Sequence, residues 1–159
     1  MIAEQMALKL KLSAQAVLEM MFMAPVLADQ EFPPPNVIAP ILVRLEFQGE
    51  VKGEFALAVA SDTATRLALS FMGMDAGEPI ERPSVIDVLG ELANMLCGHF
   101  LGQLHYHDTF CLSTPQEVSL DLLIPRGPTY QRTVHLDQGA LSMQVAIEEL
   151  GWKRPHADE

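Results

Sequence analysis

Four residues of this 159-residue chain could do chemistry together: Asp87, Glu91, Asn94 and Gly98. On an α-helix, at about 100° per residue, they fall within roughly 60° of one another. Apolar residues gather on the other side of the same segment: Val85, Val88, Leu89, Leu92, Leu96 and Phe100. The pattern predicts a helix over residues 84–102 with its apolar side in a core. Its polar front offers a carboxylate and a carboxamide at i and i+3, which can hold water and cations.

An ordinary surface helix, with polar residues that only face solvent, shows the same periodicity. The surrounding sequence favours the functional interpretation. Asp87, Glu91 and Asn94, with Pro115 downstream, resemble the active-site signature of the CheC/CheX/FliY family of chemotaxis phosphatases. That signature has Asp or Ser, three residues, Glu, two residues, Asn, and then a Pro a little over twenty residues later. The resemblance covers about residues 12–148 and is closest to the single-motif CheX branch.

The resemblance implies a phosphatase that hydrolyses phospho-aspartate on a CheY-like receiver domain of a response regulator. Asn94 would hold the attacking water in line, and Glu91 would pair with a lysine of the receiver to fix the docking angle. Asp87, Gly98 and Pro115 would support this surface. We expect no cofactor of the chain's own, because the receiver would bring its Mg²⁺. The chain departs from the signature in lacking the glycine often found shortly after the Pro, and in a slightly short spacing from Asn94 to Pro115.

Two other functions fit the same residues. A CheX-like domain could dock receivers, or assemble with flagellar or signalling partners, without catalysis. A small-ligand-binding domain is the third possibility. Phosphate release from a phosphorylated receiver separates the first two functions, and a ligand-dependent shift in melting temperature would favour the third.

Composition limits the fold and the partners. Apolar residues make up 49% and charged residues 19% of the chain, which argues against disorder. The length predicts a single domain over residues 1–150, followed by a flexible tail over 151–159. The formal net charge of −11 disfavours nucleic acid and anionic membrane as partners and would suit a partner with exposed lysines or arginines.

The order of elements predicts an α+β domain with an antiparallel-rich sheet and about three helices. Residues 41–47 and 55–60 form a hairpin whose turn carries Gly49 and Gly53. A second helix, capped by Ser61 or Asp62, follows to about residue 74. Further strands are expected at 109–114, 118–124, 133–136 and 141–148, with a turn at 137–139.

The N-terminal region imitates a secretory signal, with Lys9 and Lys11 before an apolar stretch at 14–26. Gln15 and Glu19 interrupt that stretch, and no other segment approaches the ~18–20 apolar residues that span a bilayer. We therefore expect a cytoplasmic protein whose first helix, with Ser13 as a possible N-cap, belongs to the domain.

A faint internal repeat aligns residues 17–22 with 89–94 and places Phe22 where the second copy has Asn94. The chain is therefore expected to have one site, unless the two segments are unrelated amphipathic helices. Two histidines and an aspartate within residues 105–108 suggest a metal site, but the further ligands that such a site needs are missing, so we expect no metal. Cys97 and Cys111 are expected to be reduced and part-buried.

The strand at 141–147 alternates apolar and polar residues and has no Pro or Lys to protect it as a sheet edge. Such an edge would allow another chain to add to the sheet. Together with the dimers of related CheX proteins, this predicts a homodimer.

Overall fold

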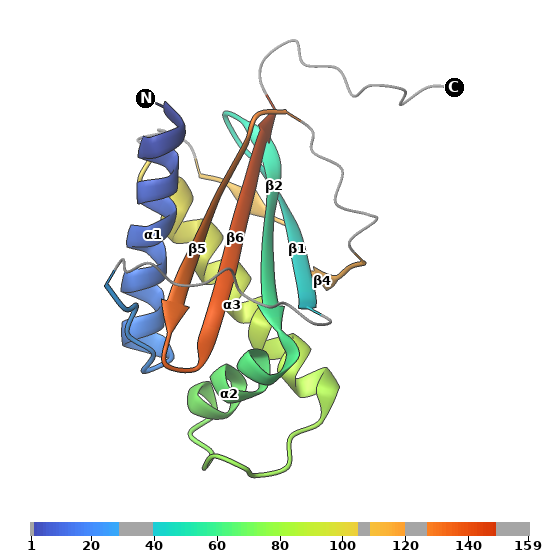
Figure 1. Cartoon of the computed structure of the whole chain (residues 1–159). Helices are drawn as coiled ribbons and strands as arrows, with labels where there is room; N and C mark the ends of the chain where they lie inside the picture. The colour runs from blue at the N-terminus through green and yellow to red at the C-terminus, as the bar shows by residue number, and fades with distance from the viewer. Residues whose placement is uncertain (1, 29–39, 105–108, 120–126, 149–159) are drawn as a thin grey trace.

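The structure, a computed structural model, describes residues 2–28, 40–104, 109–119 and 127–148. Three helices and a six-stranded antiparallel sheet form one α+β domain, as predicted (Figure 1). The helices are α1 (Ile2–Met21), α2 (Ser61–Phe71) and α3 (Arg82–Gly102). The strands are β1 (Pro40–Gln48), β2 (Lys52–Ala60), β3 (Cys111–Leu112), β4 (Gln116–Glu117), β5 (Thr129–Leu136) and β6 (Gly139–Glu148). The expected tail at 151–159 lies outside the described residues.

The sheet has the order β3-β1-β2-β6-β5, with β4 also paired to β1. The predicted hairpin is confirmed: β1 and β2 pair from Pro40↔Ala60 to Gln48↔Lys52. Gly53 lies in β2 and not in the turn. A Cβ at Gly53 would come 2.1 Å from the backbone oxygen of Ala146 on β6. A glycine is therefore needed for the close approach of these two strands.

Strand β6 lies inside the sheet, between β2 and β5. The expectation that it forms an unprotected edge was wrong. Alternation of apolar and polar residues shows that one face of a strand is buried, but it does not show which segments pair with the two sides of that strand. Those pairing partners come from distant parts of the chain.

A one-residue bulge interrupts the sheet edge beside β1. The flanking pairs are Phe47↔Leu112 and Arg44↔Gln116, so that residues 45–46 of β1 face the three residues 113–115 of the neighbouring segment. Such an insertion bends the bulged strand locally and releases side chains from the ladder. The strand predicted at 109–114 is shortened to β3, and β4 lies between the two strands predicted at 109–114 and 118–124. Most of the strand predicted at 118–124 lies outside the described residues.

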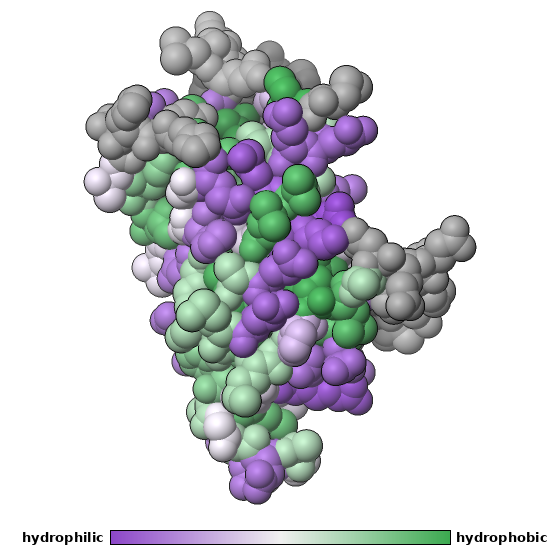
Figure 2. Space-filling view, turned by 90° about the vertical axis from the view of Figure 1, so that its left-hand side faces the viewer, coloured by the Kyte–Doolittle hydropathy of each residue, from purple (hydrophilic) through white to green (hydrophobic). Residues whose placement is uncertain are grey.

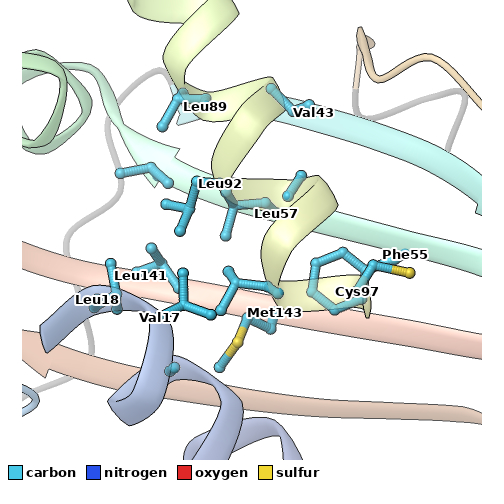
Figure 3. Packing of buried hydrophobic residues seen from close by; sticks show 14 of the residues in the cluster. Val17, Leu18, Val43, Phe55, Leu57, Leu89, Leu92, Cys97, Leu141 and Met143 are labelled. Carbon is cyan, nitrogen blue, oxygen red and sulfur yellow. The ribbon is translucent and has the colours of Figure 1, made fainter. Parts of the chain in front are cut away.

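Helices α1 and α3 pack against one face of the sheet (Figure 1). Figure 3 shows Leu89, Leu92 and Cys97 of α3 beside side chains of β1, β2 and β6, with Val17 and Leu18 of α1 completing the cluster. The four side chains expected to anchor α3 are fully buried: Leu89, Leu92, Leu96 and Phe100. This confirms the predicted apolar side of the helix.

The predicted N-caps were wrong. Ser13 lies within α1 and is fully buried. Its Oγ lies 2.7 Å from Nε2 of Gln103 and 2.9 Å from Nδ1 of His99, which joins α1 to α3. A mid-helix serine is accommodated when its hydroxyl has such partners, and sequence alone does not reveal them. Helix α2 follows Ala60 without a side-chain cap and ends at Phe71, earlier than predicted.

Helix α3 is long and apolar enough to cross a membrane by length and composition alone, which corrects the expectation that no segment has these properties. In the fold, 56% of its apolar stretch is buried inside the domain, as in the core helix of a globular protein. Figure 2, which faces the α1 side, shows apolar side chains scattered among hydrophilic ones. The exposed large apolar residues are Ile2, Leu8, Leu12, Met20, Met21, Met23 and Met72.

Candidate functional site

The polar front of α3 opens onto a groove of about 400 Å³. Asp87 and Glu91 are exposed on this front, and Asn94 is half-buried. The opposite wall of the groove comes from the bulge between β3 and β4. The lining residues are Val43, Ile86, Asp87, Val88, Gly90, Glu91, Asn94, Thr114 and Pro115. Four of the five residues that the sequence placed in the site therefore meet in one groove: Asp87, Glu91, Asn94 and Pro115.

The bulge is fixed to the sheet on one side of the groove wall and to α3 on the other. The backbone N–H of Ser113 donates to the backbone oxygen of Glu46 at 2.8 Å, and the N–H of Glu46 donates to Ser113 Oγ at 2.8 Å. Beyond the bulge, Arg82 in the first turn of α3 forms an ion pair with Glu117 of β4 at 2.5 Å. These contacts hold Thr114 and Pro115 beside the helix.

Gly90 faces Pro115 of the bulge across the groove. It is buried, and a Cβ built on it would lie 3.4 Å from the Cβ of Pro115. Sequence reasoning placed Gly90 in the motif helix but gave it no function, and it did not include Thr114, Val43 or Ile86 in the site. The available signal was a glycine inside a helix, which costs about 1 kcal/mol relative to alanine and so suggests a packing reason.

Gly98 does not line the groove. It lies one turn beyond Asn94 on the exposed side of α3, and a Cβ there would meet nothing within 4 Å. Its expected role in supporting the docking surface stays a prediction.

The polar groups of the groove are unpaired within the described part of the chain. No hydrogen bond or ion pair joins Asp87, Glu91 or Asn94 to another described residue. The cation in the first turn of the same helix, Arg82, is already paired with Glu117. The groove is therefore acidic and can accept cations and hydrogen-bond donors, but its charge would repel a free phosphate.

A second cluster of charges lies on the other face of the sheet. Val43 points to the groove, whereas the neighbouring Arg44 points to the opposite face. Arg44 forms ion pairs with Glu54 of β2 and, at 2.6 Å, with Glu46. The hydrogen bond to Glu54 raises the pKa of Arg44 above its ordinary value. This cluster links β1 to β2 and takes no part in the groove.

The first copy of the internal repeat offers no second site. Phe22, which aligns with Asn94, is fully buried and stacks on Phe71 with ring centroids 4.7 Å apart. Glu19 lies on the exposed side of α1. Glu19 has Phe22 at the i+3 position, where Glu91 has Asn94, so α1 does not reproduce the front of α3.

The other chemical candidates lie elsewhere. The cluster at residues 105–108 falls outside the described residues. Within the described segments, no three His, Cys, Asp or Glu side chains come together as metal ligands. Cys97 is fully buried, and burial raises the pKa of its thiol to about 12. Cys111 is exposed. The two cysteines were expected to be part-buried, but one is fully buried and the other is exposed.

The family model described as chemotaxis phosphatase CheX matches residues 41–136, which is more than half of the chain. The chain belongs to the CheX family. The matched region contains β1, the motif helix α3 and the bulge, and the family predicted from the residues of α3 is thereby confirmed.

Solved structures show the same fold as this CheX-family chain. The CheX-CheY-BeF3-Mg²⁺ complex from Borrelia burgdorferi has a TM-score of 0.68 and 18% identity, covering 89% of this chain and 96% of that chain. CheX from Vibrio vulnificus has a TM-score of 0.67 and 17% identity, with coverages of 91% and 97%. FliY from Thermotoga maritima has a TM-score of 0.59 and 15% identity, with coverages of 91% and 88%. Among curated protein sequences, none matches this chain.

Proposed function

We propose that this protein hydrolyses the phospho-aspartate of a CheY-like receiver domain. One observation carries the proposal: Glu91 and Asn94 face the same groove from neighbouring turns of α3, with no partner among the described residues. Membership of the CheX family supports it. The Borrelia burgdorferi relative, solved with CheY, BeF3 and Mg²⁺, supports a receiver as the partner.

Hydrolysis of an acyl phosphate needs an aligned water and neutralised charge rather than covalent help from the enzyme. The carboxamide of Asn94 both donates and accepts hydrogen bonds, so it can hold a water molecule in one orientation. Asn94 is half-buried where α3 lines the groove. Its side chain therefore has fewer orientations available than it would have at a fully exposed position. It would enter the receiver's active site already oriented.

Glu91 has a different role, because its carboxylate would repel a phosphoryl group. We assign it an ion pair with a lysine of the receiver, which fixes the angle at which Asn94 approaches. The Mg²⁺ in this proposal belongs to the receiver and neutralises charge on the phosphoryl oxygens.

Two further expectations belong to the same proposal. Hydrolysis of a receiver phosphate would take place in the cytoplasm.

A homodimer also stays a prediction, but its interface must differ from the one expected, because β6 is paired on both sides. A second copy that adds to the sheet would have to use β5 or the β3–β4 edge. Light scattering at micromolar concentration measures the mass. A monomer mass would rule out the homodimer without affecting the catalytic proposal.

The experiment that tests the catalytic proposal is phosphate release from phosphorylated CheY-like receivers, with and without the protein. We expect faster release from at least one receiver and a loss of about 100-fold in the Asn94→Ala variant, because the water loses its alignment. Gln5→Ala, which removes an exposed carboxamide on α1, is the matched control and should keep full activity.

The same assay separates the alternatives. Full activity in a folded Asn94→Ala protein would rule out the mechanism. A wild-type protein that binds receivers without accelerating release would be an adapter. A melting shift with a small molecule, and none with receivers, would indicate a ligand-binding domain.

A further inference from the structure

The groove has two chemically different parts. Its apolar surface comes from Val43, Ile86 and Val88, together with Gly90 and Pro115, which face each other across it. Its polar surface comes from two carboxylates, Asp87 and Glu91, with Asn94 and Thr114. None of the lining residues is a cation. The proposed function uses Asn94 and Glu91 but leaves Asp87 and the apolar surface without a role.

The charge and the shape of the groove together restrict what can fill it. An apolar side chain would take water away from unpaired carboxylates, which is costly. An anionic group would be repelled by them. A compact cation would satisfy the charge but leave the apolar surface open to water. A long basic side chain does both, because its aliphatic stem covers apolar surface while its charged end stays at a polar rim.

We infer that the groove binds a second basic side chain of the partner, an arginine or lysine, whose charged end pairs with Asp87. The identity of that partner as a receiver rests on the proposed function. The stem lies between Ile86 and Pro115, over Gly90. Thr114, on the opposite wall, offers a hydroxyl to the same charged end.

This cation differs from the lysine assigned to Glu91. Along the helix axis, at 1.5 Å per residue, Asp87 lies about 6 Å from Glu91 and about 10 Å from Asn94. A lysine deep in the receiver's active site, close to the water held by Asn94, is paired with Glu91. The side chain at Asp87 therefore comes from the receiver surface around the phosphorylation site. Because receivers differ in the surface residues around that site, Asp87 would help to determine which receivers this chain accepts.

Gly90 makes the inference testable without damage to the fold. A Cβ at this position would sit at ordinary contact distance from Pro115, 3.4 Å away. Gly90→Ala therefore fills part of the groove floor while the helix gains a better helix-former. We expect Gly90→Ala to bind the activated receiver more weakly than wild type while its free energy of unfolding is at least as high.

The test measures the dissociation constant of a beryllofluoride-activated receiver, chosen as the one whose dephosphorylation is most strongly stimulated. Beryllofluoride mimics the phosphoryl group and is not hydrolysed, so catalysis does not enter the measurement. We expect Asp87→Asn to weaken binding by about three- to tenfold at low salt, with the effect fading toward 1 M salt. Glu19→Gln, which makes the same charge change on the exposed side of α1, should bind as wild type.

A charge exchange then locates the partner's side chain. Asp87→Arg should bind weakly and recover when one surface lysine or arginine of the receiver is changed to glutamate. Recovery when the receiver's active-site lysine is changed would instead show that one lysine serves both carboxylates, and would overturn the inference. Equal effects of Asp87→Asn and Glu19→Gln on receiver affinity would also overturn it, because they would show that only the net charge of the protein affects binding.

A second measurement needs no receiver. N-acetylarginine amide, titrated into the labelled protein, should shift the backbone amide signals of Gly90 and Thr114 more than N-acetylnorleucine amide does, and Asp87→Asn should remove the difference. If these shifts are absent and Asp87→Asn binds the receiver as wild type, the inference fails while the proposed function stands. If Asn94→Ala keeps full turnover but Asp87→Asn weakens receiver binding, the mechanism proposed for Asn94 fails and the groove assignment stands.

Discussion

Gly90 of α3 and Pro115 of the bulge face each other across the groove, where a Cβ on the glycine would come 3.4 Å from the Cβ of the proline. The two residues are 25 positions apart in the chain, and Pro115 lies in the bulge between the paired segments β3 and β4. A methyl group at this position would occupy part of the groove, and the helical glycine costs about 1 kcal/mol in helix stability relative to alanine.

The first prediction concerns the stability of the Gly90→Ala variant. We expect its free energy of unfolding to rise by about 0.5–1 kcal/mol, because alanine loses less backbone freedom on folding and its methyl group fits without a shift. Urea denaturation followed by circular dichroism measures the change. A lower stability than wild type would mean that α3 and Pro115 are closer than this contact distance allows.

The second prediction concerns Glu91, whose carboxylate is exposed and has no partner among the described residues. Glu91→Gln should weaken receiver binding about tenfold, because a docking ion pair is lost. The fold should be unaffected, since no internal contact is removed. Calorimetry with the activated receiver measures the affinity, and Glu4→Gln on the exposed side of α1 is the control. Unchanged affinity with slower turnover would place Glu91 in the chemical step instead.

The third prediction concerns the two thiols. Cys111 is exposed and Cys97 is fully buried, so a thiol reagent such as DTNB should modify one cysteine in the native protein and two after denaturation. Mass spectrometry of the modified protein identifies the site. Rapid modification of Cys97 under native conditions would show that α3 detaches easily from the sheet.

The fourth prediction follows from the pKa of the Cys97 thiol, which burial raises from 9.0 to about 12. The folded state then holds this proton more tightly than the unfolded state. The resulting stability is fully present below about pH 9 and is lost as the pH rises toward 12, at up to about 1.4 kcal/mol per pH unit. Urea titrations between pH 8 and 11 should show a steeper loss for wild type than for Cys97→Ala. Parallel curves would contradict the prediction.

The sequence by itself determined the faces of α3. A helix places residues three and four positions apart on one side, so the separation of Leu92 from Glu91 and Asn94 follows from spacing alone. The β1–β2 hairpin was equally local, because its two strands are joined by a short turn. The type and order of these residues also carried the resemblance to the CheX family.

Only the tertiary structure decided what faces the front of α3. The bulge at residues 113–115, the contact between Gly90 and Pro115 and the interior place of β6 all depend on pairings between distant segments. The buried partners of Ser13 on α3 are equally non-local. Periodicity reports which side of an element is buried, but it carries no information about the element that buries it. The groove exists because two such elements meet, and its shape therefore had to come from the fold.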